Sequence, residues 1–150
     1  MIVFQNVCLQ LGNVQILKNL NFSVEKGEFI CLLGPSGCGK STILRLIGDL
    51  LAGTSGMIRV AGGPPSEAWE KLAYVFQNPR LLPWKNALEN AAFGLEMRHP
   101  DLGAKERLDL ASKQLTKVGL AKDMQKMPIM LSGGERQRVS IARALALKPE

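Results

Sequence analysis

Residues 34–42, with the sequence Gly34-Pro35-Ser36-Gly37-Cys38-Gly39-Lys40-Ser41-Thr42, predict the fold of the chain around them. An apolar run, Phe29–Leu33, precedes this stretch and predicts a buried strand. The spacing of apolar residues over Ile43–Ile47, directly after it, suits a helix packed on that strand. The spacing G-x-x-x-x-G-K-S between a strand and a helix is that of a Walker A phosphate loop. The sequence therefore predicts a strand, a glycine loop and a helix N-terminus in succession.

The chemistry expected of this loop is phosphate binding. Its glycines let successive backbone N–H groups face inward, and the helix adds unpaired N–H groups with a partial positive charge. We expect Lys40 to reach the β and γ phosphates of a nucleotide, Ser41 to offer its hydroxyl to Mg²⁺, and Thr42 to support the α phosphate. The alternative is a glycine-rich turn that only caps a helix. The loop, the lysine, the hydroxyl and both flanking elements together favour the phosphate loop.

The composition is that of a soluble globular domain. The chain has 150 residues, of which 46% are hydrophobic and 21% charged, enough for one domain with a core. Its net charge of +6 comes from scattered lysines and arginines, so it predicts no nucleic-acid partner, and a nucleotide polyphosphate suffices. The cysteines Cys8, Cys31 and Cys38 lack metal-ligand spacing and favour a reducing compartment. No apolar stretch approaches the roughly 18 residues needed to span a membrane, so membrane association requires a partner.

Several short strands are expected on both sides of the loop. Alternating apolar residues and turn residues predict strands over residues 2–9, 14–24 and 57–60. Residues 72–76 predict a further buried strand, which ends at the proline of Gln77-Asn78-Pro79. We expect an antiparallel sheet laid over the start of an α/β core.

From Asn86 onward the sequence predicts helices. Apolar residues recur at steps of four and three over residues 104–118, which places them on one helix face. Another helix is expected over residues 135–147. The methionines spaced over residues 124–130 are interpreted as core residues rather than as ligands. The predicted order along the chain is β, then α/β, then α.

A second motif, Leu131-Ser132-Gly133-Gly134-Glu135-Arg136-Gln137, opens the last of these helices. A serine hydroxyl and two glycine backbones directly before a helix form an anion site of the same design as the first. Ser132, three residues before Glu135, is also the pattern of a capping box, and taken alone the motif favours that interpretation. The residues by themselves leave both interpretations open.

A phosphate loop and LSGGERQ in one chain resemble the ATP-binding cassette (ABC) ATPases of transporters. The resemblance covers essentially the whole chain and implies an α/β fold. It implies a P-loop NTPase core with an N-terminal antiparallel β subdomain and a helical signature subdomain. The β subdomain, P-loop core and Q-loop are expected at about 1–85, the helical subdomain at about 86–135, and the signature helix at 136–150.

The resemblance also implies ligands and a partner. In this family two cassettes pair head to tail and hold ATP, with Mg²⁺, between the phosphate loop of one and the signature motif of the other. By resemblance, Ser132, Gly133 and Gly134 touch the γ phosphate of ATP bound to a second copy. Residues 34–42 bind the nucleotide of their own copy.

Two further segments receive a role only through the resemblance. Gln77 stands where the family has its Q-loop glutamine, a catalytic residue that binds Mg²⁺ directly or through water. The alternative is a solvated strand end. Leu81–Trp84 stands where the family receives the coupling helix of a membrane permease, and the alternative is that these side chains pack in a core.

The wording Leu-Leu-Pro-Trp also resembles importers of nitrate, sulfonates, taurine and related small compounds. That likeness implies a transport-coupled ATPase attached peripherally to the cytoplasmic face of the inner (plasma) membrane. Permease subunits would be its direct partners, and an extracytoplasmic solute-binding protein an indirect one.

The sequence departs from the family at three places. Leu11 stands where an aromatic residue stacks on adenine, a contact worth about 1 kcal/mol, and Asp49 stands where the family has glycine. After the signature helix the family continues into a Walker B strand that ends in the Mg²⁺-binding aspartate and the catalytic glutamate, whereas this sequence ends at Glu150.

We therefore expect a cassette truncated before the Walker B strand, with unpaired sheet edges and exposed apolar surface. We also expect slow hydrolysis, because general-base catalysis contributes about 10²–10⁴-fold. The two alternatives are a non-hydrolysing nucleotide-binding remnant and a soluble ABC ATPase that is not linked to transport.

Overall fold

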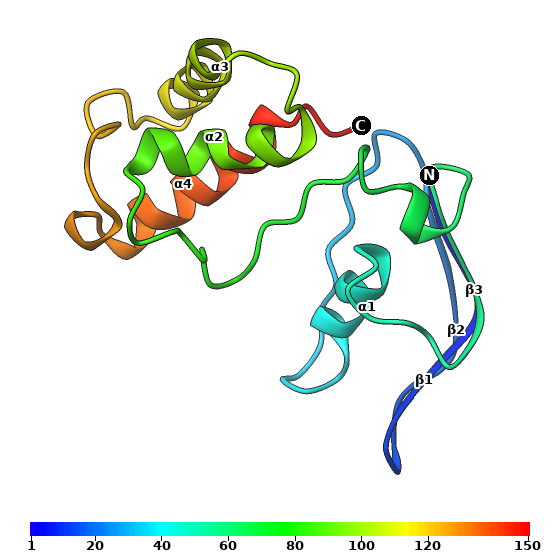
Figure 1. Ribbon diagram of the computed structural model, residues 1–150. Coiled ribbons are helices and arrows are strands. Elements are labelled where there is room, and N and C mark those ends of the chain that lie inside the picture. The colour runs from blue at the N-terminus through cyan, green and yellow to red at the C-terminus, as the bar shows by residue number, and fades with distance from the viewer. The chain divides into compact units, whose positions relative to one another are not determined.

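The structure, a computed structural model, describes residues 1–150 and divides into two compact units, Met1–Leu72 and Ala73–Glu150. The first unit holds a sheet and one helix, and the second holds three helices (Figure 1). No helix combines the length and the apolar character that crossing a membrane requires.

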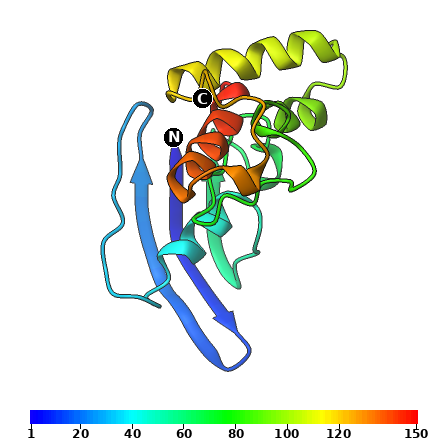
Figure 2. The same cartoon turned by 90° about the vertical axis from the view of Figure 1, so that its left-hand side faces the viewer.

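The first unit is built on a three-stranded antiparallel sheet. Its strands are β1 (Ile2–Leu11), β2 (Val14–Val24) and β3 (Ser55–Val60), in the order β2-β1-β3. Figure 2 shows β1 and β2 as a long hairpin. Phe4 on the central strand faces Phe22 on one side and Ile58 on the other, and the two phenylalanine rings stack at 4.6 Å. The predicted antiparallel sheet is therefore confirmed.

The helix α1 (Lys40–Ile47) follows the glycine loop and packs on this sheet. Its buried residues Ile43 and Leu46 join the apolar cluster formed by the two long strands. Because burying one such side chain contributes about 1.5–3 kcal/mol, these two contacts fix the helix on the sheet and so fix the loop at its N-terminus.

The end of α1 accommodates Asp49, which stands where the family has glycine. Leu50 N–H donates to the Arg45 carbonyl at 2.8 Å, as in a Schellman ending, and Asp49 adopts a φ of +54°. Aspartate tolerates this left-handed conformation better than most residues, because its short polar side chain can bond locally. The backbone therefore keeps the conformation that favours glycine.

Two predicted strands are wrong. Residues 29–33 and 72–76 form no strand, and Phe29 and Leu33 have exposed fractions of 92% and 87%. An apolar run predicts burial, but a strand also needs a neighbour that accepts and donates ladder hydrogen bonds. Neither segment pairs with another strand in this structure, so the parallel part of the expected core is not formed.

The second unit is a small helical bundle. It consists of α2 (Ala87–Arg98), α3 (Ala104–Lys117) and α4 (Gly133–Ala146), and each helix packs on the other two (Figure 1). Short 3₁₀ turns occur at Pro128–Met130 in this unit and at Pro65–Glu67 in the first. The helices predicted from apolar periodicity are confirmed.

The core of this bundle is made of alanine, leucine and valine side chains. On α3 the predicted apolar face is buried at Ala111 and Leu115, whereas Ala104 at its start is exposed. Met124 packs against the core, but Met130 is 63% exposed, so the prediction of core methionines holds for the first and is wrong for the last. Met130 ends the short 3₁₀ turn Pro128–Met130, in which no residue is buried.

Residues 73–85, which precede α2 in the sequence, belong to the helical unit. These residues, expected in the β and P-loop part, lie in the second compact unit. The reason is local: Leu81 packs against the helical core, and the backbone of Leu82 bonds to Asn90 of α2.

Candidate functional site

The glycine loop has the backbone shape that phosphate binding needs. Gly34, Gly37 and Gly39 have φ angles of +152°, +85° and +96°, which L side chains rarely adopt. A Cβ atom on Gly34 would lie 2.8 Å from the Sγ atom of Cys38, and one on Gly39 would lie 3.0 Å from the side chain of Leu17. Conformation calls for glycine at all three positions, and close neighbours add to that requirement at Gly34 and Gly39.

Two backbone donors of this loop have no partner within the protein, one on the exposed Gly37 and one on the buried Gly39. No hydrogen bond within the protein uses the N–H groups of Gly37 and Gly39, and α1 begins without a side-chain cap. Pro35, Ser36, Cys38 and Ser41 are exposed, and Thr42 is half-buried. A helix N-terminus with unpaired N–H groups attracts anions.

Lys40 brings a positive charge to the same place. It is the first residue of α1, and its Nζ atom donates to the carbonyls of Gly34 at 2.9 Å and Pro35 at 2.6 Å. Its ammonium also lies 3.5 Å from the Sγ atom of Cys38 and forms no ion pair with a carboxylate. The charge is thus held over the loop by neutral acceptors, which a polyphosphate can replace.

Gln77 is exposed at the end of an irregular segment rather than of a strand. The residue before it is tethered: the Phe76 carbonyl accepts from Gln137 Nε2 of α4 at 3.3 Å. The Arg80 guanidinium lies 4.4 Å from the centroid of the Phe76 ring, in a cation–π contact. The backbone around Gln77 is therefore ordered by its neighbours while its amide faces solvent.

The motif at residues 131–137 forms the capping box that was one of its two interpretations. Ser132 is the N-cap of α4: its Oγ atom accepts from Glu135 N–H at 3.3 Å, and its own N–H donates to the Glu135 carboxylate at 2.6 Å. The hydrogen bond from the Ser132 backbone, followed by that involving its side chain, lowers the pKa of Glu135 from its ordinary value of 4.5.

The two glycines of this motif have no structural need to be glycine. A Cβ atom on Gly133 or on Gly134 would meet nothing within 4 Å, and neither residue has a positive φ. Glycine inside a helix costs roughly 0.5–1 kcal/mol relative to alanine. Unlike Gly39, these two residues leave an exposed stretch of bare backbone beside the exposed Ser132, a surface that a ligand can approach closely.

The segment Leu81–Trp84 is partly packed in the core and partly exposed, so each of its two interpretations, core packing and a docking surface, applies to some of its residues. Leu81 packs against the helical core, whereas Pro83 is exposed and Trp84 has an exposed fraction of 70%. Leu11, at the end of β1, is 48% exposed and is available for contact with a ligand, without the flat ring that stacking requires.

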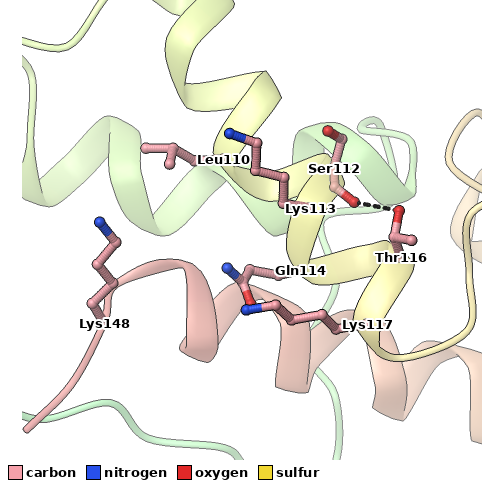
Figure 3. A pocket seen from close by; sticks show the side chains of 7 residues that line it. All are labelled: Leu110, Ser112, Lys113, Gln114, Thr116, Lys117 and Lys148. Carbon is pink, nitrogen blue, oxygen red and sulfur yellow. Dashed lines mark hydrogen bonds between the residues drawn. The ribbon is translucent and has the colours of Figure 1, made fainter.

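A cavity of about 540 Å³ lies elsewhere, beside α3 (Figure 3). Its lining consists of Leu110, Ser112, Lys113, Gln114, Thr116, Lys117 and Lys148. It contains none of the residues predicted to bind the nucleotide. The candidate site residues lie instead on loops and at helix N-termini.

Mg²⁺ is the ion that the sequence predicts for this site. The chain has no group of three or more His, Cys, Asp or Glu side chains that could hold a metal ion alone. The donors proposed from the sequence are the exposed Ser41 hydroxyl and the Gln77 amide oxygen. A hydroxyl oxygen suits Mg²⁺ when phosphate oxygens supply the remaining ligands, so Ser41, beside the glycine loop, fits the ion together with a nucleotide.

Sequence reasoning missed two polar residues that organise the second unit. Asn90 of α2 is fully buried, and Arg143 of α4 is partly buried beside it. Apolar periodicity gives no signal for a buried amide or guanidinium. The one available clue is an asparagine directly before the apolar run Ala91–Leu95.

Comparison with known proteins supplies the family. The family model described as ABC transporter matches residues 17–150. The chain is 44% identical over 139 residues to the bicarbonate transport ATP-binding protein of Synechocystis sp., which covers 93% of this chain and 49% of that protein. It is also 44% identical over 139 residues to the nitrate import ATP-binding protein of Synechococcus elongatus, with 93% of this chain and 51% of that protein covered.

The taurine import ATP-binding protein of Escherichia coli is 41% identical over 154 aligned residues, which cover the whole chain and 58% of that protein. The chain thus spans about half the length of these curated relatives. Among solved structures, a dimeric ATP-binding cassette in a post-hydrolysis state with ADP and Pi superposes with a TM-score of 0.91 at 34% identity. The match covers 99% of this chain and 71% of that one.

Proposed function

Because the chain belongs to the ABC transporter family, we propose that it is the ATP-binding part of an importer and couples ATP binding and hydrolysis to solute uptake. The observation that carries the proposal is the glycine loop of residues 34–39 with Lys40 held over it. Free N–H donors, a helix N-terminus and an unpaired ammonium converge there, which is the chemistry that a triphosphate requires.

In this proposal Lys40 exchanges its hydrogen-bond acceptors within the loop for phosphate oxygens. Lys40 leaves the carbonyls of Gly34 and Pro35 and donates to phosphate oxygens, where a charge-assisted bond is roughly twice as strong as a neutral one. The N–H groups of Gly37 and Gly39, which have no partner in the protein, donate to the same phosphates. Ser41 and, by resemblance to the family, Gln77 would hold Mg²⁺, which would supply positive charge against the phosphate oxygens.

The motif at residues 131–137 is proposed to act on a second copy of the cassette. Ser132, Gly133 and Gly134 expose a hydroxyl and bare backbone at the N-terminus of α4, where anions are favoured. This surface suits the γ phosphate of ATP bound to the loop of a partner cassette. The capping box and the ligand surface are compatible, because the box uses the Ser132 hydroxyl only as an acceptor and leaves its O–H free to donate to a phosphate oxygen.

The solute is proposed from the relatives. Their names state bicarbonate transport, nitrate import and taurine import. We place this chain with importers of such small solutes, including nitrate, sulfonates and taurine. The exposed pair Pro83 and Trp84 is proposed to contact the permease at the cytoplasmic face of the membrane, with a solute-binding protein acting through that permease.

The proposal is tested by titrating the chain with MgATP in a calorimeter. Lys40→Ala is expected to weaken binding at least tenfold, because it removes the one cation over the loop. Lys26→Ala, which removes an exposed lysine from a turn of the same unit, is the matched control and is expected to change the dissociation constant less than twofold. Equal affinities for the wild-type chain and Lys40→Ala, or no binding by the wild-type chain, would overturn the assignment.

A further inference from the structure

Asn90 is a buried polar side chain that organises the segment preceding its own helix. Its Oδ1 atom accepts from Leu82 N–H at 2.8 Å. Its Nδ2 group donates to the carbonyls of Leu82 at 3.0 Å, Lys85 at 2.7 Å and Asn86 at 3.0 Å. An unsatisfied buried amide costs about 1–3 kcal/mol, so these bonds hold the path of residues 82–86 tightly.

Arg143 connects this arrangement to α4. Its Nε atom donates to the Asn90 carbonyl at 2.9 Å, and its Nη2 atom donates to Asn90 Oδ1 at 2.8 Å. Its Nη1 atom donates to the carbonyl of Arg80 at 3.3 Å. All three acceptors are neutral oxygens, and burial lowers the pKa of the Arg143 guanidinium. The contact therefore depends on the planar geometry of the guanidinium, which a lysine cannot reproduce.

A second attachment lies nearer the start of α4. Gln137 Nε2 donates to the Phe76 carbonyl at 3.3 Å, six residues before Arg143 and so about 9 Å away along the helix axis. Hydrogen bonds from two side chains at different positions along a helix fix both its position and its rotation relative to the segment that accepts them. The segment held by these hydrogen bonds, residues 76–85, contains Gln77 near one end and the exposed Trp84 near the other.

We propose that Asn90 and Arg143 are positioning residues that make residues 76–85 and α4 move as one body, so that the segment sets the position of Ser132 and its neighbours. This inference rests on the proposed function, in which Trp84 meets a permease and Ser132 meets a nucleotide. A displacement at Trp84 is passed through Asn90 to Arg143 and then along the rigid helix to its N-terminus.

The first test measures amide hydrogen exchange of the 150-residue chain without nucleotide. Arg143→Lys is expected to raise exchange at least tenfold at the Leu82 amide and at the amides of Glu135 and Arg136, which bond to Ser132. Arg138→Lys, on the exposed side of the same helix, is the matched control and is expected to leave these amides unchanged.

A variant that weakens the bundle in another way separates positioning from general stability. Val139→Ala removes buried core volume from α4 without touching the attachments, and is expected to raise exchange throughout the bundle. The proposal is overturned if Arg143→Lys gives that uniform pattern, or if the amides of Glu135 and Arg136 stay as protected as in Arg138→Lys. Because no nucleotide is present, failure of ATP binding leaves this result intact.

The second test uses the cassette assembled with its permease. Arg143→Lys and Asn90→Asp are expected to lower kcat for ATP hydrolysis at least fivefold with KM for ATP within twofold, since the phosphate loop lies in the other unit. Asn90→Asp keeps the acceptor for Leu82 and Arg143 but loses both N–H donors, which the carbonyls of Leu82, Lys85 and Asn86 share. An unchanged kcat, or a loss confined to KM, would contradict a positioning role while leaving ATP binding by the loop in place.

Discussion

At the scale of single residues, the glycines of the two motifs differ in what they do for the fold. Gly34, Gly37 and Gly39 have backbone angles that exclude most side chains, so the fold itself requires them. Gly133 and Gly134 have ordinary angles and open space around them. Residues that lower helix stability without a packing reason are expected where something outside the chain approaches.

This difference predicts opposite effects of one substitution. Gly134→Ala is expected to raise the free energy of unfolding by roughly 0.5–1 kcal/mol, because alanine is the better helix former. The added methyl group is expected to weaken MgATP-dependent dimerisation at least tenfold by blocking approach to the backbone. Urea unfolding and analytical ultracentrifugation measure the two effects.

The control for that substitution is Gly103→Ala at the N-cap of α3. A Cβ atom there also meets nothing within 4 Å, but the residue is outside the motif. Dimerisation is expected to be unaffected by it. If Gly134→Ala dimerises as well as the wild-type chain, the surface at Ser132–Gly134 is not a ligand site and the motif is only a cap.

At the scale of secondary-structure elements, the sequence predicts the helices and strands whose burial follows a local apolar pattern. It does not predict whether a segment finds a neighbouring strand to pair with. Apolar residues alternate along β1 and β2 and recur on one face of α3, and these patterns by themselves indicate which side of each element is buried. Residues 29–33 and 72–76 carry the same apolar signal, yet a strand exists only when another strand completes its hydrogen bonds. Asn90 and Arg143 were missed because a buried polar pair leaves no periodic trace.

The capping box of α4 predicts how its stability depends on pH. The pKa of Glu135 is lowered in the folded state, so its carboxylate stabilises the fold fully above its ordinary pKa of 4.5. That contribution is lost as the pH falls below 4.5 and through the lowered folded-state pKa. Glu135→Gln, which keeps an acceptor without the charge, is therefore expected to be less stable than wild type near pH 7 and equally stable in acid.

Thermal melts from about pH 3 to pH 7 measure this difference. The gap in Tm between wild type and Glu135→Gln should be constant at neutral pH and shrink as the carboxylate is protonated. A gap that stays constant down to pH 3 would show that the charge of Glu135 contributes nothing to the helix terminus.

At the scale of the whole molecule, the chain combines two units whose proposed roles differ. The sheet with α1 presents the phosphate loop, and the bundle presents Gln77, Trp84 and the motif at the start of α4. The chemistry of the loop could be predicted because it resides in nine consecutive residues. Asn90 and Arg143 are 53 positions apart in the sequence, so the hydrogen bonds between them could be found only in the folded structure.

The central claim is that the glycine loop binds the phosphates of ATP, and amide exchange at the loop tests it most directly. The N–H groups of Gly37 and Gly39 have no partner in the protein, so the account predicts that MgATP slows their exchange at least tenfold. AMP, which lacks the β and γ phosphates, is expected to slow it less than twofold. Unaltered exchange with saturating MgATP, or equal protection by AMP, would contradict the claim.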